Sequence, residues 1–468
     1  MAIPLEPSDE QMRAIGAAAL DHVASFIDGL DETSAAGGTG DALEIASTIG
    51  GAPPETGRPF DEVLADFGRG AERALEPAGP GYLAYIPGGG LYSAALASFL
   101  AAGVNRFVNL AATAPAFVRM EVDVLRWFCD LFGLPVTAGG ILTTGGSMAN
   151  LSAIVTARRA RLPEDFLDGT IYVSQQAHAS VAKAAAIAGL PDRGVVRVPV
   201  TRELRLDVDA LADQVARDRS AGRSPFCVVA NAGTTNTGAI DPLEPIADLC
   251  VREGLWLHVD AAYGGFFQLT ERGRERFRGI DRADSITLDP HKGMFLPYGT
   301  GSLLVRDAAL LRDAHASSGA AYLQDLVAGG QILPSFAEYS PELSREFRGL
   351  RVWLPLQLHG VAAFRDALEE KLDLAEQVHR ELASDPRLEV PWTPDLSIVA
   401  FRLADPGPDE IGANRAFLER INASQRVFLS STMVHGRFIL RIAVLSFRTH
   451  ADRIHEAIEI VRREAKAL

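Results

Sequence analysis

Two stretches of the 468-residue sequence decide the fold: Leu255-Trp-Leu-His-Val-Asp260 and Ser285-Ile-Thr-Leu-Asp-Pro-His-Lys292. Each opens with a short, continuous apolar run, which is typical of a strand buried on both faces of a parallel sheet. Each run then ends in charged residues. In an open α/β sheet, ligands bind beyond the carboxyl ends of the strands. We therefore expect Asp260 and Lys292 to lie together at that edge of one sheet.

Further runs of the same kind extend this pattern from about residue 140 to residue 305, and helical stretches separate them. They are Ile141–Thr144, Thr170–Ser174, Val195–Val200, Cys227–Asn231 and Ser302–Val305. The alternation predicts a mainly parallel sheet within a large α/β domain.

The segments on either side of this region have other patterns. The first 30 residues carry apolar side chains at helical spacing, and residues 33–58, rich in Gly, Thr, Pro and Ala, are expected to form an exposed connector. After the sheet region we expect an amphipathic helix at about 354–384, two β-type runs at 396–402 and 438–443, and a final helix at about 451–466.

These patterns predict three parts: an N-terminal helical segment (1–85), a large α/β domain (86–355) and a smaller C-terminal α+β domain (356–468).

The composition is that of a globular protein, with 47% hydrophobic and 22% charged residues. The formal net charge of −15 disfavours nucleic acid and anionic membranes as partners. No signal peptide is evident, and no apolar run approaches the roughly 18 residues of a membrane span. The three cysteines are widely spaced, which fits a reducing compartment. We expect a cytoplasmic protein that acts on a small molecule and has no metal site.

The segment Ile141-Leu-Thr-Thr-Gly-Gly-Ser-Met-Ala-Asn150 is predicted to be a strand, a glycine-rich turn and the start of a helix. Ser147 stands where an N-cap is expected, so the amide groups of the first turn can hold an anion. A simple capped helix is an alternative. A dinucleotide site is disfavoured because GxGxxG is absent. A serine hydrolase remains a rival, because Gly145-Gly-Ser147-Met-Ala149 nearly matches the nucleophile elbow.

The sequence contains only four lysines, Lys183, Lys292, Lys371 and Lys466. Lys183 and Lys371 lie on predicted helices and Lys466 is close to the C-terminus, so these three are expected to be solvated charges. Lys292 follows a buried strand, which is unusual because lysine is rarely buried without a partner.

A phosphate cradle, a strand-end aspartate and a strand-end lysine together indicate pyridoxal phosphate. The amine of Lys292 would form a Schiff base with this cofactor, and desolvation would lower its pKa enough to react. Asp260 would pair with the pyridinium nitrogen and keep the ring an electron sink. A serine hydrolase would leave Lys292 unexplained.

At this point the sequence resembles the group II pyridoxal-phosphate decarboxylases, the family of aromatic-L-amino-acid, histidine and glutamate decarboxylases. Four ordered motifs carry the resemblance, which spans about residues 10–460. They are Ser174-Gln-Gln-Ala-His178-Ala-Ser-Val, Ala232-Gly-Thr-Thr-Asn-Thr-Gly238, His258-Val-Asp-Ala-Ala-Tyr263 and Asp289-Pro-His-Lys292. The resemblance implies the fold type I architecture of pyridoxal-phosphate enzymes, in which the large domain has a mainly parallel sheet.

The resemblance also implies a role for each matching residue. His178 would stack on the cofactor ring and help place the substrate carboxylate, and Thr235, or less favourably Thr234, would bond near the ring hydroxyl. Ala262 would let the ring lie flat, and His291 would support the phosphate. The phosphate would also receive hydroxyl and amide donors from Ser147, Met148 and Ala149.

The family returns a proton to the substrate from a tyrosine on a loop of the dimer partner. Tyr339 is our choice for that residue, whereas an ungapped alignment would place Phe336 there and favour oxidative deamination to an aldehyde. Tyr85 and Pro87 are candidate walls of the substrate pocket. Asp289 stands where some members place a phosphate-binding Asn, and we expect it to point away and to pair with backbone or an arginine.

The implied activity is decarboxylation of an L-amino acid, aromatic or otherwise neutral, to an amine and CO2 in a homodimer with shared active sites. An aldehyde synthase, another carbon–carbon lyase and an aminotransferase are rivals within the same chemistry. A serine hydrolase using Ser147 and a catalytically inactive binding scaffold are rivals outside it.

Overall fold

The computed structural model describes residues 4–37, 42–316 and 333–468. Its contacts divide the chain into two compact units. One unit comprises residues 88–379 and 391–400 and is called the large unit here; the other comprises residues 1–87, 380–390 and 401–468 and is called the small unit. The three-part division expected from the sequence stays a prediction.

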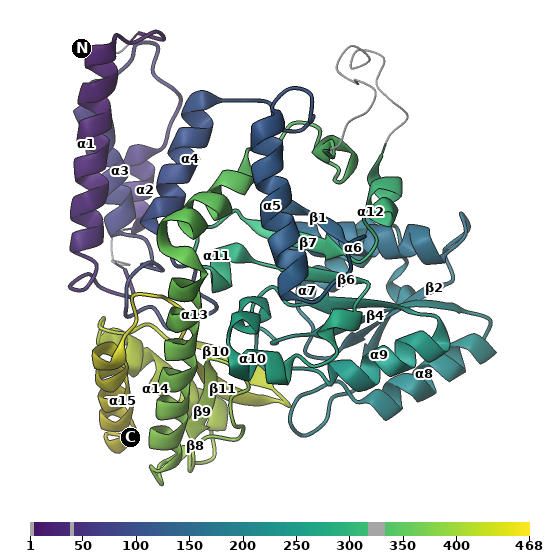
Figure 1. Cartoon of the computed structure of the whole chain (residues 1–468). Coiled ribbons are helices and arrows are strands. Elements are labelled where there is room, and N and C mark those ends of the chain that lie inside the picture. The colour runs from purple at the N-terminus through teal and green to yellow at the C-terminus, as the bar shows by residue number, and fades with distance from the viewer. Residues whose placement is uncertain (1–3, 38–41, 317–332) are drawn as a thin grey trace. The chain divides into compact units, whose positions relative to one another are not determined.

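The large unit is built on a seven-stranded sheet with the order β1-β7-β6-β5-β4-β2-β3 (Figure 1). Neighbours from β6 to β3 run parallel, whereas β7 is antiparallel to both β6 and β1. The fold is therefore the mainly parallel α/β architecture that the sequence predicts. The strands are β1 (Gly139–Thr143), β2 (Gly169–Ser174), β3 (Val195–Val198), β4 (Ser224–Asn231), β5 (Trp256–Asp260), β6 (Ser285–Leu288) and β7 (Gly301–Val305).

The central strands β5 and β6 are buried along their whole length, as their unbroken apolar sequences predict. Their register pairs Asn231 with Asp260 and Asp260 with Thr287, so the carboxyl ends of β4, β5 and β6 come level at one edge of the sheet. The loops that follow these strands are thereby brought together.

Helices pack on this sheet. The helix α6 (Gly146–Arg161) lies across β4, β5, β6 and β7 and contacts α7 (Ala179–Ile187), while α8 (Val208–Ser220) and α9 (Leu243–Glu253) contact β4 and each other (Figure 1). Further helices of this unit are α4 (Tyr92–Val104), α5 (Pro115–Leu131), α10 (Glu271–Arg276), α11 (Pro290–Gly293) and α12 (Ala308–His315).

The long helix α13 (Arg348–Ala383) begins in the large unit, and its last residues belong to the small one. It is broken at Gly360, whose φ of 73° is left-handed. Lys371 on this helix is fully buried, with its Nζ 2.7 Å from a carboxylate oxygen of Glu370. The expectation that Lys371 is a solvated charge is wrong, and burial lowers the pKa of its amine.

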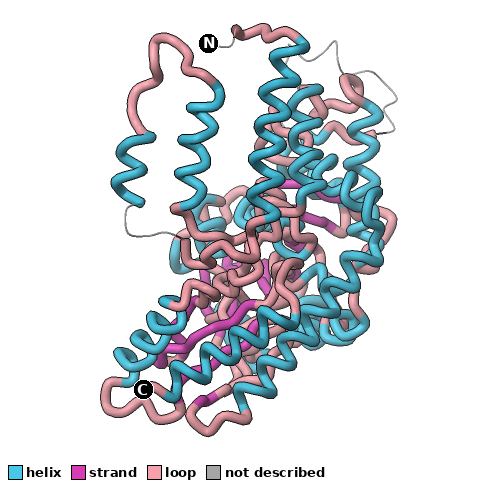
Figure 2. The backbone as a smooth tube through the Cα atoms, turned by 90° about the vertical axis from the view of Figure 1, so that its left-hand side faces the viewer, coloured by secondary structure: helices cyan, strands magenta, loops and turns pink. Residues whose placement is uncertain are grey.

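The small unit combines N-terminal helices with a four-stranded sheet of order β10-β11-β9-β8, whose strands are labelled in Figure 1. Figure 2 draws helices in cyan and strands in magenta. One helix, α2, forms within residues 33–58, the segment expected to be an exposed connector, and none of its residues is buried. The elements are α1 (Asp9–Asp28), α2 (Ala42–Ile49), α3 (Phe60–Glu72), β8 (Leu388–Glu389), β9 (Ile398–Leu403, from Phe401 in this unit), α14 (Glu410–Ala423), β10 (Ser430–Val434), β11 (Arg437–Ala443) and α15 (Ala451–Lys466).

Candidate active site

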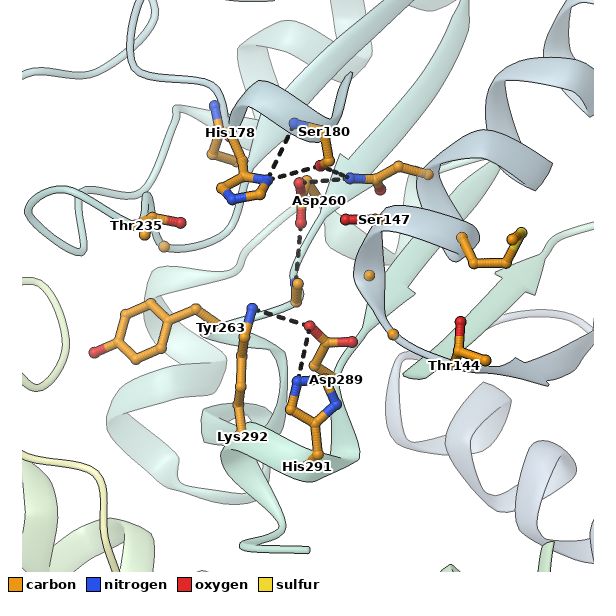
Figure 3. Close-up of a pocket in the computed structure, with 17 residues that line it drawn as sticks. Thr144, Ser147, His178, Ser180, Thr235, Asp260, Tyr263, Asp289, His291 and Lys292 are labelled. Carbon is orange, nitrogen blue, oxygen red and sulfur yellow. Dashed lines mark hydrogen bonds and ion pairs between the residues drawn. The ribbon is translucent and has the colours of Figure 1, made fainter. Parts of the chain in front are cut away.

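A cavity of about 300 Å³ lies in the large unit, where the carboxyl ends of β4, β5 and β6 meet the first turns of α6 and α7. Most of the residues selected from the sequence line it (Figure 3). The lining residues are Thr144, Gly145, Gly146, Ser147, Met148, Asn150, His178, Ser180, Asn231, Gly233, Thr235, Asp260, Ala262, Tyr263, Asp289, His291 and Lys292.

Lys292 enters this cavity from α11, a single helical turn that starts at Pro290 directly after β6. Its Nζ lies 2.9 Å from Oδ2 of Asp289, and Nε2 of His291 lies 3.6 Å from the same oxygen (Figure 3). Asp289 therefore points into the cavity and pairs with the lysine. The expectation that it points away and pairs with backbone or an arginine is wrong, because the helical turn sets Asp289 and Lys292 at i,i+3 spacing.

His291 lines the cavity beside Asp289 and is held by a hydrogen bond to the backbone. Its Nδ1 lies 2.7 Å from the carbonyl oxygen of Thr300 and is the donor of that bond, since a carbonyl only accepts. Burial lowers the pKa of the imidazole, although the charge of Asp289 opposes the shift.

Asp260 lies at the end of β5 with only 7% of its surface exposed. Both carboxylate oxygens accept hydrogen bonds: Oδ1 from the amide of Ala262 at 3.1 Å and Oδ2 from Nδ2 of Asn150 at 3.0 Å. Buried carboxylates are retained where donors compensate the lost hydration. These two bonds hold the aspartate in one orientation.

Asn150 also connects Asp260 to His178. Its Nδ2 donates to Oγ of Ser180 at 3.0 Å, and that hydroxyl lies 2.7 Å from Nδ1 of His178 (Figure 3). The amide of Ser180 also donates to Nδ1, so this nitrogen is the acceptor and the ring proton belongs to Nε2. The imidazole is exposed, with Nδ1 fixed and its other nitrogen left as a donor.

Behind Asn150 the chain of hydrogen bonds continues to the indole of Trp256. Trp256 Nε1 can only donate, and it donates to Oγ of Ser285 at 2.8 Å. Oδ1 of Asn150 can only accept, so Nε2 of His258 donates to it at 3.1 Å, and Nδ1 of the neutral ring then accepts from the Ser285 hydroxyl at 2.8 Å. His258 is neutral in this arrangement, and burial lowers its pKa to about 4.

The first turn of α6 forms the opposite wall. Gly145 precedes the helix with φ 157°, and no side chain caps the helix, so the expected N-cap role of Ser147 is wrong: the helix starts one residue before it. The amides of Met148 and Ala149 donate to the carbonyl of Gly145 at 3.0 and 3.1 Å. The amides of Gly146 and Ser147 precede them and, as the first amides of the helix, have no intrahelical acceptor; such orphan amides bind anions.

The remaining cofactor candidates differ in position. Thr235 and Ala262 line the cavity, whereas Ala149 is fully buried and is not among the lining residues. Tyr263 lines the cavity and is held in place through its hydroxyl, which accepts the amide of Ser397 at 3.0 Å.

The donor set of this cavity fits pyridoxal phosphate. The lysine amine matches the aldehyde of the cofactor, and the strand-end carboxylate matches its ring nitrogen. The exposed imidazole can stack on the aromatic ring, and the helix N-terminus can bind the phosphate. Asp289 is the exception, since a carboxylate repels a phosphate.

Comparison with known proteins decides the family. Residues 51–404 match the model described as the pyridoxal-dependent decarboxylase conserved domain. The chain belongs to this family. Pyridoxal phosphate is its cofactor, and the enzyme is a pyridoxal-phosphate-dependent decarboxylase.

Relatives cover nearly the whole chain. An aromatic-L-amino-acid decarboxylase of Bacillus atrophaeus is 35% identical over 97% of this chain and 95% of its own length. A phenylacetaldehyde synthase of Arabidopsis thaliana is 27% identical over 99% and 98%. The crystal structure of Oryza sativa TDC with PLP and tryptamine has a TM-score of 0.93 and 25% identity, covering 100% of this chain and 99% of that chain.

Three residues chosen from the sequence, Tyr85, Pro87 and Tyr339, are not among the residues that line the cavity of the decarboxylase. Tyr85 and Pro87 belong to the small unit, where the amide of Tyr85 donates to Oγ of Ser430 at 3.0 Å. Tyr339 follows a short 3-10 turn, η5 (Phe336–Glu338), and its ring is 6.4 Å from that of the buried Phe336. The roles of these residues stay predictions.

Sequence reasoning missed Asn150, Ser180, His258 and Tyr263 as parts of the site. His258 could have been found, because residues at i and i+2 of a strand lie on the same face and His258 is two residues before Asp260. Asn150 could not, since its bond to Asp260 joins positions 110 residues apart.

Proposed function

We propose that this enzyme decarboxylates an aromatic L-amino acid to its amine and CO2. The observation that carries the proposal is the meeting of Lys292, Asp260 and the open face of His178 in one cavity at the N-terminus of α6. The decarboxylase of Bacillus atrophaeus and the rice structure with tryptamine support the choice of an aromatic substrate.

Bound pyridoxal phosphate supplies a protonated ring that accepts the electron pair released as CO2 leaves. Three elements of this chain would hold the cofactor. Lys292 would anchor its aldehyde, and the orphan amides of Gly146 and Ser147 would receive its phosphate. Asp260 would accept a hydrogen bond from the ring nitrogen and keep that nitrogen protonated, with its own orientation fixed by Asn150 and Ala262.

His178 would orient the substrate. With Nδ1 bonded to Ser180, its Nε2–H is free to donate to the substrate carboxylate. That contact would hold the bond to the leaving carboxylate perpendicular to the ring, where its electrons enter the π-system. The exposed imidazole face would at the same time stack on the ring.

A substrate with a neutral side chain is favoured because the lining residues that the structure describes include no arginine. The carboxylates of Asp260 and Asp289 in the same cavity would also disfavour a second carboxylate on the substrate. Like charges repel strongly in a site withdrawn from water.

The proposal is tested with the purified holoenzyme and a panel of L-amino acids that includes tryptophan, tyrosine, phenylalanine, glutamate and histidine. The expected products are CO2 and the amine of an aromatic member in equal amounts. Turnover of glutamate alone would contradict the proposed substrate class.

An aldehyde synthase is the second candidate, because a phenylacetaldehyde synthase is similar over 99% of this chain. That activity consumes O2 and releases an aldehyde, ammonia and hydrogen peroxide along with CO2. Measuring peroxide and amine in the same reaction separates the two. Tyr339→Phe and Phe336→Tyr, compared side by side, would identify the position that controls the choice between amine and aldehyde production.

The other rivals have less support. Arg441, a possible carboxylate clamp of an aminotransferase, is a buried residue of β11 that donates to Oγ of Ser430 at 3.0 Å. For a serine hydrolase, Ser147 needs a base, and no hydrogen bond joins its hydroxyl to a histidine within the described parts of the chain. A carbon–carbon lyase other than a decarboxylase would appear in the substrate panel as cleavage without CO2.

We further propose that the enzyme is a cytoplasmic homodimer with shared active sites. The three cysteines are free and buried, which supports a reducing compartment. In the described residues no helix is long and apolar enough to cross a membrane. Light scattering during size-exclusion chromatography tests the dimer, and cell fractionation tests the location.

A further inference from the structure

The carboxylate of Asp289 lies against the N-terminus of α6, at the place that would receive an anion. A Cβ atom added at Gly146, the first residue of that helix, would lie 3.0 Å from Oδ2 and 3.4 Å from Oδ1 of Asp289. The Asp289 side chain is only 3% exposed. Its Oδ1 is buried and has no hydrogen-bond partner, so half of the carboxylate is unsatisfied.

The other oxygen is committed to the lysine. Oδ2 lies 2.9 Å from Nζ of Lys292 and 3.6 Å from Nε2 of His291. Because burial lowers the pKa of His291, the imidazole provides little positive charge, and Lys292 is the main counter-ion of Asp289. The carboxylate is thus an anion with one cation, held at a helix N-terminus.

A cofactor phosphate entering this cavity meets that carboxylate. The phosphate monoester carries nearly two negative charges at neutral pH, and the helix N-terminus is the part of the cavity that attracts them. A phosphate bound at the first turn of α6 would lie near this carboxylate, and two anions withdrawn from water repel each other; Oδ1 of Asp289 has no donor that would screen its charge. The carboxylate would therefore weaken the attraction between the N-terminus of α6 and the phosphate.

We propose that the carboxylate of Asp289, lying beside the first residue of α6, repels the cofactor phosphate and holds the affinity of this enzyme for pyridoxal phosphate below what the rest of the cavity would give. The chain would then release its cofactor readily and be loaded according to the cofactor concentration around it. The inference concerns cofactor binding and requires no turnover.

The test compares pyridoxal phosphate with pyridoxal, which lacks the phosphate. Cofactor-free wild type and Asp289→Asn are titrated with each compound, and the dissociation constants are read from the absorbance of the bound form. Asparagine keeps the size of the side chain and removes its charge. We expect pyridoxal phosphate to bind at least about tenfold more tightly to Asp289→Asn, and pyridoxal to change by less than about threefold, because the lost repulsion involves only the phosphate.

Asp284→Asn is the matched control, since Asp284 precedes β6 as Asp289 follows it and does not line the active-site cavity. Its affinities for both compounds should stay within about twofold of wild type. Thermal unfolding of the cofactor-free proteins checks folding, and Asp289→Ser serves as a second variant with the same expectation.

An unchanged or weaker affinity of both Asp289 variants for pyridoxal phosphate would overturn the proposal. An equal gain for pyridoxal would also overturn it, because Asp289 would then act through Lys292 and not at the phosphate position. Neither result depends on the substrate, so a failure of the proposed decarboxylation and a failure of this inference are distinguishable.

Discussion

Asn150 is the residue on which the geometry of the active site most depends, and its replacement by leucine tests that directly. Leucine has the same number and branching of side-chain heavy atoms as asparagine and is compatible with the helix α6. The substitution removes the donor that serves both Asp260 and Ser180, each at 3.0 Å, and the acceptor that His258 uses at 3.1 Å. All of these contacts are buried.

The expected loss follows from the bonds removed. A hydrogen bond to a carboxylate contributes about 1.5–3 kcal/mol, a neutral one about 1 kcal/mol, and an unsatisfied buried donor costs about 1–3 kcal/mol. Since such terms are not additive, we expect the free energy of unfolding to fall by about 3 kcal/mol. The affinity for pyridoxal phosphate should fall about 10- to 100-fold, because the Asp260 carboxylate loses the donor that orients Oδ2 toward one position.

Two further variants make the assay specific. Thr156→Val removes a buried hydrogen bond on the same helix, from Oγ1 to the carbonyl of Ser152 at 2.7 Å, and should leave cofactor affinity unchanged. Ser180→Ala breaks only the branch to His178. It should retain cofactor affinity within about threefold and lower kcat/KM about fivefold, since the imidazole loses a neutral bond of about 1 kcal/mol and keeps only the one from the Ser180 amide.

Cofactor affinity is measured by absorbance titration, and stability by denaturant unfolding of the cofactor-free protein. If Asn150→Leu binds pyridoxal phosphate as tightly as wild type, Asn150 does not position Asp260 and the hydrogen-bond chain has no role in cofactor binding.

Further predictions concern pH, buried charge and the thiols. Burial lowers the pKa of His258 to about 4 from an ordinary value near 6.5, so the folded state binds fewer protons than the unfolded state between these pH values. The free energy of unfolding should therefore fall by up to about 3 kcal/mol as the pH is lowered from 6.5 to 4. His258→Gln should flatten the pH profile of denaturant unfolding in that window. Glu121 and Arg345 form a buried ion pair at 2.6 Å, so Glu121→Gln should lower the free energy of unfolding by about 3–5 kcal/mol. The double variant Glu121→Gln with Arg345→Met should recover most of that loss. If the losses of the two single variants simply add in the double variant, the two side chains are not coupled. Burial raises the pKa of the Cys129 and Cys250 thiols to about 12, and it raises the pKa of Cys227 as well. All three cysteines should therefore react with a thiol reagent at pH 8 only after unfolding. Rapid labelling of the native enzyme would show that a thiol is accessible.

The sheet could be predicted from the sequence because its strands are short, continuously apolar and separated by helices. The ends of the final helix were predicted as residues 451–466, and α15 spans Ala451–Lys466. The meeting of Asp260 and Lys292 at one edge followed from the rule for open sheets, and both line the cavity.

Other features depend on tertiary structure and could not be read from local patterns. Helix α2 forms in a segment whose glycines and prolines indicated a connector. The ion pair of Asp289 with Lys292 exists because Pro290 starts a helical turn directly after β6, which places the two side chains at i,i+3. Lys371 is buried by the packing of α13, although its neighbours in the sequence are largely charged.

The most direct test of the account is the covalent position of the cofactor. Borohydride reduction of the yellow holoenzyme, followed by proteolysis and peptide mass spectrometry, should place one pyridoxyl phosphate group on the peptide that contains Lys292, and Lys292→Ala should carry none. Lys183 is exposed on α7, close in sequence to His178, and serves as the internal control. A label on Lys183, or no label in a protein that still releases CO2 from an aromatic amino acid, would contradict the central claim.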